Sequence, residues 1–252
     1  MDNLLSSVKN SCRVLKFFLE SPKELGVTEI SKKLSLSKSA VHKMLATLES
    51  EGFIQQNQKT KQYMLGYTLL ELGNKVLRDH DIVEYAKPHL QELANSTKEL
   101  VSLCIRDGND AIYVDKIDSQ YTIRFNVDIY RRFPLYATCA ARAILAFQPD
   151  SFIDSILASP LKEYTSESIT EAQDMKKRLL RIRQNGYEVS SNMRNIGVTG
   201  IAAPIYDVTS QVVCSISLIG PTDRMIAPLD SYREKVQQTA KILSEGLGYH
   251  NN

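Results

Sequence analysis

Cationic and hydrogen-bonding side chains occupy one side of the segment from Lys38 to Ser50. At the 3.6-residue period of a helix, the opposite side is an apolar stripe of Val41, Leu45 and Leu48. The polar side consists of Lys38, Ser39, His42, Lys43 and Thr47. Side chains of these types bind phosphate oxygens and reach the base edges in the major groove of duplex DNA. The segment therefore offers the chemistry of nucleic-acid recognition.

A short helix directly upstream is predicted to hold this segment in place. Ile30 and Leu34 lie four residues apart on one side of it, Thr28 is a candidate N-cap, and Glu29 falls in its first turn. The sequence Ser35-Leu36-Ser37 predicts a tight break, with Ser37 capping the helix that follows. Two short helices joined in this way form a helix-turn-helix, whose second helix enters the major groove.

A β-hairpin is predicted immediately after the second helix. Residues 53–66 have the pattern of two short strands around a polar tip, and Lys59 and Lys61 at this tip can reach the neighbouring DNA backbone or minor groove. A plain helical hairpin with a solvated outer face is the alternative interpretation, but a winged helix explains both segments with one fold. The predicted DNA contacts are Thr28, Ser37, Lys38, Ser39, His42, Lys43, Thr47, Lys59 and Lys61.

The distribution of charge agrees with an anionic partner for the first part of the chain only. Residues 1–66 carry ten Lys or Arg against six Asp or Glu, a net charge of +4, whereas the remaining residues carry 21 against 23, a net charge of −2. No apolar run approaches the about 20 residues that cross a bilayer, and the first residues lack the pattern of a secretion signal. We therefore expect a cytoplasmic protein without a membrane partner.

The rest of the chain is predicted to mix helices and strands. Apolar residues at helical spacing predict a helix over 6–20, and two further helices over 69–77 and 82–96. Later segments predict the strands 101–105, 111–117, 121–127, 200–206 and 212–219 and the helices 138–147, 150–158, 170–185 and 229–247. The expected fold class is α+β, with a winged helix-turn-helix over 1–66, linker helices over 67–98 and a second domain over 99–250.

Several longer stretches resemble the IclR family of bacterial transcriptional regulators. They are VTEISKKLSLSKSAVHKMLATLESEGFI and KTKQYMLGYTLLELG in the first part, and FPLYATCAARAILAF, QNGYEVSSNMRNIGVTGIAAPIYD and VVCSISLIGPTDRM in the second. Because they follow the family's order and spacing, the resemblance covers residues 5–247. It implies a dimerising linker helix and an effector-binding domain of profilin- or GAF-like fold. It also implies a homodimer or a dimer of dimers on operator DNA, acting mostly as a repressor, for operons of small organic acids, aromatics or sugars.

The resemblance also implies a pocket for a small-molecule effector, which we expect to be a small organic or sugar acid. Carried over by position, its wall is formed by Thr122, Phe125, Phe133, Cys139, Ala140, Ser190, Val198, Gly200, Ser217 and Ile219. The residues themselves agree with this, because Thr138 is a candidate cap for a helix that begins at Cys139, and small residues over 137–141 allow close approach of a ligand. Core packing is the alternative interpretation for Phe125, Phe133 and Val198.

This sequence departs from the family where ligand identity is decided. Tyr136 stands where the family commonly has His, Arg142 where it has Lys, Ser190 where it often has an acidic residue, and Gly200 where it has a polar residue or Cys. A pocket with fewer acidic groups and added aromatic rings suits an anionic or bulkier ligand. A regulator that has lost effector binding is an alternative interpretation.

Cysteine chemistry gives a second alternative, from a different class of protein. Cys139 at a helix N-terminus near Arg142 has two features of a nucleophile, and it makes an enzyme on a GAF-like domain conceivable. A catalytic cysteine needs a base, however, and His42, His80, His89 and His250 all lie in the DNA-binding, linker or tail segments. The four cysteines are far apart and show no metal-ligand spacing. We therefore expect no enzyme activity, no cofactor and no metal.

Overall fold

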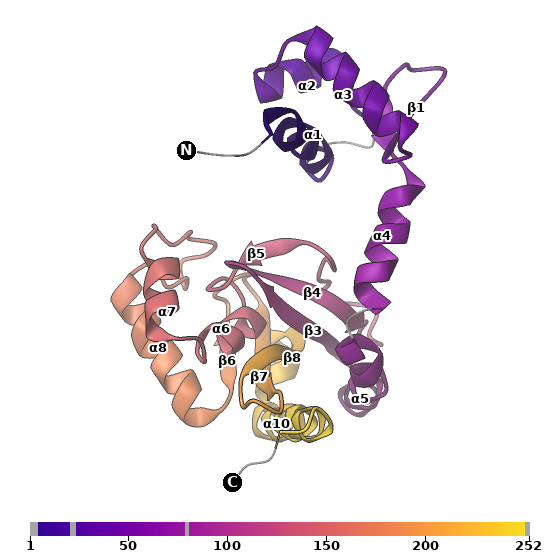
Figure 1. Ribbon diagram of the computed structural model, residues 1–252. Coiled ribbons are helices and arrows are strands. Elements are labelled where there is room, and N and C mark those ends of the chain that lie inside the picture. Colours follow the sequence, from indigo (N-terminus) through magenta and orange to yellow (C-terminus); the bar gives the residue numbers. More distant parts are fainter. Residues whose placement is uncertain (1–4, 21–23, 79–80, 250–252) are drawn as a thin grey trace. The chain divides into compact units, whose positions relative to one another are not determined.

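The chain folds as two compact units, Met1–His80 and Asp81–Asn252. The computed structural model describes residues 5–20, 24–78 and 81–249 (Figure 1). The first unit contains α1 (Ser6–Phe17), α2 (Val27–Leu34), α3 (Lys38–Ser50), β1 (Ile54–Gln56), β2 (Tyr63–Leu65) and α4 (Tyr67–Arg78). The predicted helix-turn-helix followed by a hairpin is confirmed.

Two local details of this unit differ from the sequence predictions. The first helix ends at Phe17, three residues earlier than predicted, because residues 18–20 form a turn instead of continuing the helix. Thr28 is not an N-cap: α2 begins one residue before it, and Gly26 holds the extended backbone conformation of the cap without a side-chain hydrogen bond. The break between α2 and α3 turns at Ser35, whose φ of 54° is left-handed.

The hairpin is joined to the helices through backbone contacts. The backbone N–H groups of Leu25 and Tyr63 each donate to the other's carbonyl at 2.9 Å, which adds a short third segment beside β2. Leu25 is fully buried beside Ile30, Val41 and Leu45 in the core of this unit. The hairpin is therefore fixed to the same core that holds α2 against α3.

The second unit is built around a six-stranded antiparallel sheet in the order β5-β4-β3-β8-β7-β6. Its strands are β3 (Leu100–Asp107), β4 (Asp110–Ile117), β5 (Arg132–Pro134), β6 (Glu188–Ser191), β7 (Val198–Tyr206) and β8 (Val212–Pro221). Its helices are α5 (Asp81–Thr97), α6 (Cys139–Leu145), α7 (Asp150–Leu157), α8 (Ala172–Asn185), α9 (Thr222–Ile226) and α10 (Leu229–Gly246). The predicted α+β class is confirmed.

Helices cover both faces of the sheet (Figure 1), and a separate apolar layer lies between the sheet and the helices on each face. Helices α6, α7 and α8 pack on one face, with Cys104, Leu179 and Ile219 among the buried residues. Helices α5 and α10 pack on the other face, with Leu90, Leu218 and Leu243 among them. Neighbouring residues of β8 enter opposite layers, as the period of two in a strand requires.

The two edges of this sheet were predicted incorrectly. Residues 121–127 alternate apolar and polar side chains as a strand does, but they form a loop, and the edge strand β5 lies at Arg132–Pro134. Of the alternating apolar side chains, Tyr121 and Ile123 are exposed, while Phe125 and Val127 pack at the edge of the α6-side core and line a cavity. Strand β6 at the other edge was missed, because four residues are too few for a periodic signal. Within the described ranges, no helix is both long enough and apolar enough to cross a bilayer.

Candidate nucleic-acid interface and ligand cavity

Helix α3 presents a polar face to solvent. Lys38, Ser39, His42, Lys43 and Thr47 are all exposed, while Val41 and Leu45 are fully buried beneath them. Ser37 caps the helix, because its Oγ accepts a hydrogen bond from the backbone N–H of Ala40 at 3.2 Å. The Thr47 hydroxyl donates to the Lys43 carbonyl at 2.9 Å, and so its lone pairs stay available to an outside donor. Thr28 is exposed in the first turn of α2.

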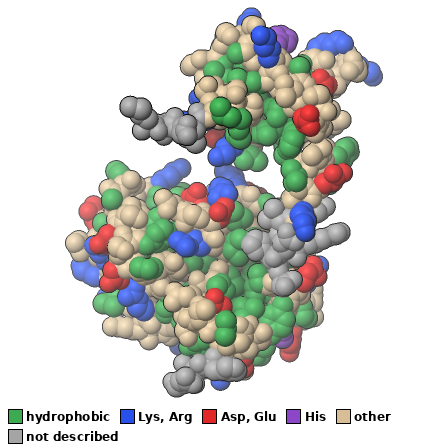
Figure 2. All heavy atoms as spheres, viewed as in Figure 1, with side chains coloured by type: hydrophobic (Ala, Val, Ile, Leu, Met, Phe, Trp, Pro, Cys, Tyr) green, Lys and Arg blue, Asp and Glu red, His purple; other side chains and the backbone are tan. Residues whose placement is uncertain are grey.

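The tip of the hairpin is a compact turn that carries two lysines. Lys59 and Lys61 are exposed, and Figure 2 shows Lys and Arg side chains gathered at this tip. The Asn57 side-chain oxygen accepts hydrogen bonds from the backbone N–H groups of Lys59 (2.9 Å) and Thr60 (3.3 Å). Lys61 has a φ of 58°, and its N–H donates to the Asn57 carbonyl at 2.8 Å. Asn57 therefore determines the shape of the turn that displays both cations.

Glu24 fastens this tip to the segment that leads into α2. Its two carboxylate oxygens accept hydrogen bonds from the Asn57 side-chain amide and from the Thr60 hydroxyl, each at 2.7 Å. Sequence reasoning missed both Glu24 and Asn57, since they lie 33 residues apart and neither belongs to a periodic pattern. A carboxylate and an amide of this kind hold the two lysines in a fixed place on the surface of the unit.

A cavity of about 410 Å³ lies on the α6 face of the sheet in the second unit. Its buried walls come from strands and from α6, while its rim comes from loops between them. Seven of the ten residues predicted for the pocket line it, namely Phe125, Phe133, Cys139, Ser190, Val198, Gly200 and Ile219. Their role in binding an effector stays a prediction.

Three of the ten predicted residues do not line this cavity. Thr122 is exposed on the loop that replaces the predicted strand. Ala140 is fully buried in α6, where its carbonyl accepts a hydrogen bond from the Ser215 hydroxyl at 2.8 Å. Ser217 is fully buried as well, with its Oγ 2.8 Å from that of Ser102. Ala140 and Ser217 therefore make contacts inside the core, where they were expected to face a ligand.

Sequence reasoning missed two of the cations around the cavity, Lys162 and Arg194. Among the described residues, four cations line it, Arg131, Arg132, Lys162 and Arg194, against one carboxylate, that of Asp128. Lys162 and Arg194 come from the irregular segments 158–171 and 192–197, which have no periodicity that would place them on one site. The excess of positive charge would attract an anion.

Two family profiles match the chain. The one described as "IclR helix-turn-helix domain" covers residues 7–58, and the one described as "Bacterial transcriptional regulator IclR C-terminal" covers residues 74–245. The chain belongs to the IclR family of bacterial transcriptional regulators.

Proteins similar to this IclR regulator match along its whole length. The HTH-type transcriptional regulator KipR of Bacillus subtilis (strain 168) is 36% identical over 251 residues, covering 99% of this chain and 100% of KipR. The crystal structure of the Thermotoga maritima IclR is 31% identical with a TM-score of 0.76, covering 96% and 99% of the two chains. An IclR homolog from Microbacterium hydrocarbonoxydans, solved in complex with 4-hydroxybenzoate, shares the fold, with 20% identity, a TM-score of 0.83 and coverage of 96% and 99%.

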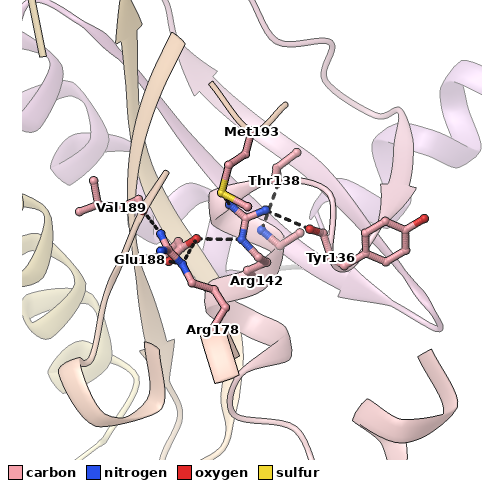
Figure 3. Close-up of polar contacts among 8 residues, drawn as sticks. Tyr136, Thr138, Arg142, Arg178, Glu188, Val189 and Met193 are labelled. Carbon is pink, nitrogen blue, oxygen red and sulfur yellow. Dashed lines mark hydrogen bonds and ion pairs between the residues drawn. The ribbon is translucent and has the colours of Figure 1, made fainter. Parts of the chain in front are cut away.

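A buried ionic cluster of Arg142, Arg178 and Glu188 lies next to the cavity of this IclR regulator (Figure 3). Arg142 of α6 is 1% exposed, and its Nε donates to a carboxylate oxygen of Glu188 in β6 at 2.8 Å. Arg178 of α8 donates to the same carboxylate at 2.9 Å. Arg142 also donates to the Tyr136 carbonyl at 3.0 Å, and its Nη2 lies 3.7 Å from the sulfur of Met193, which lines the cavity. The cluster joins α6, α8, β6 and the cavity loop in one network.

The chemistry of Cys139 in this IclR regulator is that of a buried thiol. Burial raises its pKa from 9.0 to about 11, and the nearby Arg142 lowers the pKa only in part. The Thr138 hydroxyl oxygen accepts a hydrogen bond from the backbone N–H of Ala141 at 3.2 Å, which confirms Thr138 as the cap of α6. In the part of the chain that the structure describes, no group of three or more His, Cys, Asp and Glu side chains could hold a metal ion.

Proposed function

We propose that this protein is a repressor that binds operator DNA through α3 and the tip of the β1–β2 hairpin. The observation that carries the proposal is the division of α3 into a buried and an exposed face. Val41 and Leu45 are fully buried, whereas the neighbouring side chains of His42 and Lys43 are exposed. A polar helix face of this kind is free to enter a major groove without disturbing the core.

Electrostatics and local geometry support the same proposal. Lys38, Lys43, Lys59 and Lys61 supply cations for phosphate oxygens, and Ser39 and Thr47 supply hydroxyl groups. His42 stands where the helix face would approach the base edges. Each lysine that binds a phosphate releases a counterion, so that operator affinity should fall steeply as the salt concentration rises.

We further propose a homodimer or a dimer of dimers that binds a pseudo-palindromic site. Exposed apolar side chains on α4 support this, since Tyr67, Leu70 and Leu72 are 75%, 59% and 49% exposed. Tyr67 and Leu70 are three residues apart and share one face of the helix. Burying this face against the same face of a second copy would be favourable by roughly 25 cal/mol for each Å² of apolar surface. Leu70→Glu should therefore shift the mass measured by light scattering toward the monomer. An unchanged mass would argue against α4 as the interface.

The cavity of the second unit is the proposed effector site, and a small organic or sugar acid is the proposed class of effector. The four lining cations support an anionic ligand. The Microbacterium homolog of the same fold was crystallised with an aromatic acid. Binding there would favour one arrangement of the subunits over another and so change operator affinity.

An enzyme that uses Cys139 is the alternative function, and the surroundings of the thiol argue against it. Its pKa of about 11 leaves it protonated at neutral pH. Among the described residues that line the cavity, none is a histidine, and the carboxylate of Asp128 is paired with Arg131 at 3.2 Å. A nucleophilic cysteine needs a base within hydrogen-bond distance. We therefore propose a protein that binds and releases its effector unchanged.

Operator binding can be tested with the full-length chain and a duplex from the region upstream of its own gene. Fluorescence anisotropy at several salt concentrations would compare His42→Ala and Lys43→Gln with Lys241→Gln, an exposed lysine on α10. We expect Lys43→Gln to reduce the slope of log affinity against log salt by about one, and His42→Ala to weaken binding by about 1–3 kcal/mol. Lys241→Gln should match the unmodified chain. Unchanged affinity in both α3 variants would contradict the proposal.

A further inference from the structure

Two cations lie over the ring of Tyr164 at the rim of the cavity. The guanidinium carbon of Arg194 lies 3.7 Å from the ring centroid, and the Nζ of Lys162 lies 5.3 Å from it. All three residues line the cavity. The contacts are those of cation–π pairs, which orient a charged side chain without neutralising it.

These two cations differ from the other two at the cavity, because their charges are not matched by carboxylates. Arg131 pairs with Asp128, and Arg132 pairs with Asp107. Over residues 5–20, 24–78 and 81–249, neither Lys162 nor Arg194 forms an ion pair. The positive charge available to a ligand is therefore concentrated around Tyr164.

Hydrogen bonds between two loops hold Lys162, Tyr164 and Arg194 together in the absence of a ligand. Thr165 donates from its hydroxyl to the Asn192 carbonyl at 2.6 Å, and Ser168 donates to the Met193 carbonyl at 2.8 Å. The Ser168 oxygen in turn accepts from the backbone N–H of Tyr164 at 2.9 Å. These bonds tie the loop that carries Lys162 and Tyr164 to the loop that carries Arg194.

The loop of Arg194 is also held from inside the unit. Met193 precedes Arg194, and its sulfur lies against the buried guanidinium of Arg142 (Figure 3). On the other side, the Asn192 side-chain oxygen accepts from the backbone N–H of Gly197 at 2.7 Å and closes the loop. Because both ends are fixed, little ordering entropy is lost when an anion binds to Arg194.

We propose that Arg194 and Lys162 form the anion-binding end of the effector site and that the effector is a carboxylate with an apolar body. This inference rests on the proposed effector role of the cavity. The sheet contributes large apolar side chains to the same lining, with Tyr113 and Ile219 buried and Phe133 and Val198 half-buried. The acid group therefore lies at the rim, and the apolar body of the ligand extends toward the sheet.

Calorimetry with matched acid and amide probes tests this orientation in the full-length protein. Sodium benzoate and benzamide have the same shape and differ in charge, and sodium gluconate is an acid without an apolar body. The variants are Arg194→Gln and Lys162→Gln, and the matched control is Arg181→Gln, an exposed arginine on α8 outside this cavity. Circular dichroism would check that each variant is folded.

We expect benzoate to bind more tightly than benzamide or gluconate. Arg194→Gln should weaken benzoate roughly ten- to a hundredfold, as expected for the loss of a charged hydrogen bond, and Lys162→Gln should weaken it less, because Lys162 is the more exposed of the two. Benzamide binding should stay within about twofold in both variants. Arg181→Gln should bind benzoate as the unmodified chain does.

Three outcomes would overturn the inference. They are benzoate binding that does not depend on Arg194 or Lys162, benzamide or gluconate binding at least as tightly as benzoate, and no binding of any probe. Operator binding by the same preparations separates this failure from a failure of the proposed function. A chain that binds operator DNA but shows any of these outcomes remains a DNA-binding regulator with a different ligand site or none.

Discussion

Gly200 of β7 lies directly against the thiol of Cys139 at the N-terminus of α6. A Cβ built on Gly200 would be 2.5 Å from Sγ of Cys139, which is closer than non-bonded atoms approach. Both residues line the cavity. The absence of a side chain at one position thus makes room for the side chain at the other, and together they shape one wall.

The first prediction follows from this contact. Gly200→Ala should force the Cys139 thiol into the cavity and destabilise the second unit by about 1–3 kcal/mol. In a Cys139→Ala background the same change should be neutral or stabilising, since the space is free and alanine loses less backbone entropy than glycine in a strand. Urea unfolding of the four chains measures this coupling. If Gly200→Ala changed the free energy of unfolding equally in both backgrounds, the contact with the Cys139 thiol would not be the cause of the destabilisation.

A second prediction concerns the display of the hairpin lysines. Asn57→Ala removes the hydrogen bonds that shape the tip and hold it to Glu24 without changing the net charge. We expect operator affinity to fall severalfold, because Lys59 and Lys61 must be ordered on binding. Gln55→Ala, at an exposed position of β1 outside the tip, is the control. The prediction would be contradicted if Asn57→Ala bound DNA as Gln55→Ala does.

The buried ionic cluster gives a third prediction. Glu188→Gln leaves the guanidinium of Arg142, 1% exposed, without a compensating charge. Removal of one partner from a buried pair typically costs about 3–5 kcal/mol. Asp154→Asn, which breaks the exposed pair with Lys176, should cost less than about 1 kcal/mol. Comparable urea midpoints for the two variants would rule out a structural role of this size for Glu188.

A fourth prediction concerns pH. Burial raises the pKa of Cys139 to about 11 from an ordinary value of 9.0, so the folded chain retains a proton there that the unfolded chain releases. The resulting contribution to stability is fully present below about pH 9 and is lost as the pH rises toward 11. Cys139→Ala should therefore flatten the fall in melting temperature over this range. An identical slope in the variant would contradict the raised pKa.

Alkylation of the cysteines offers an independent check on the raised pKa of Cys139. At pH 8 a thiol with a pKa of about 11 is ionised to about one part in a thousand, and the thiolate is the reacting species. Cys12 is exposed, while Cys104, Cys139 and Cys214 are buried. Mass spectrometry of the folded chain treated with iodoacetamide should find Cys12 modified first. Early modification of Cys139 would revive the enzyme interpretation.

Local sequence patterns were sufficient to predict the helices and strands of the first unit and most of those of the second unit. The positions of Val41, Leu45 and Leu48 predict both the existence of α3 and its buried side, because helical periodicity needs only neighbouring residues. The same reasoning failed for residues 121–127, where Phe125 and Val127 alternate as in a strand but line a cavity. The alternation of apolar residues does not show that Tyr121 and Ile123 stay exposed, because that depends on where the loop passes over the rest of the unit.

The sequence by itself determined the helix-turn-helix, the α+β class, the family and seven residues that line the cavity. Tertiary structure alone decided that Lys162 and Arg194 join that cavity. Lys162 and Arg194 are 32 residues apart in the chain, and they meet at Tyr164 only because hydrogen bonds of Thr165 and Ser168 join two irregular loops. Such contacts depend on the path of the whole chain in space, and no periodicity of neighbouring residues encodes them.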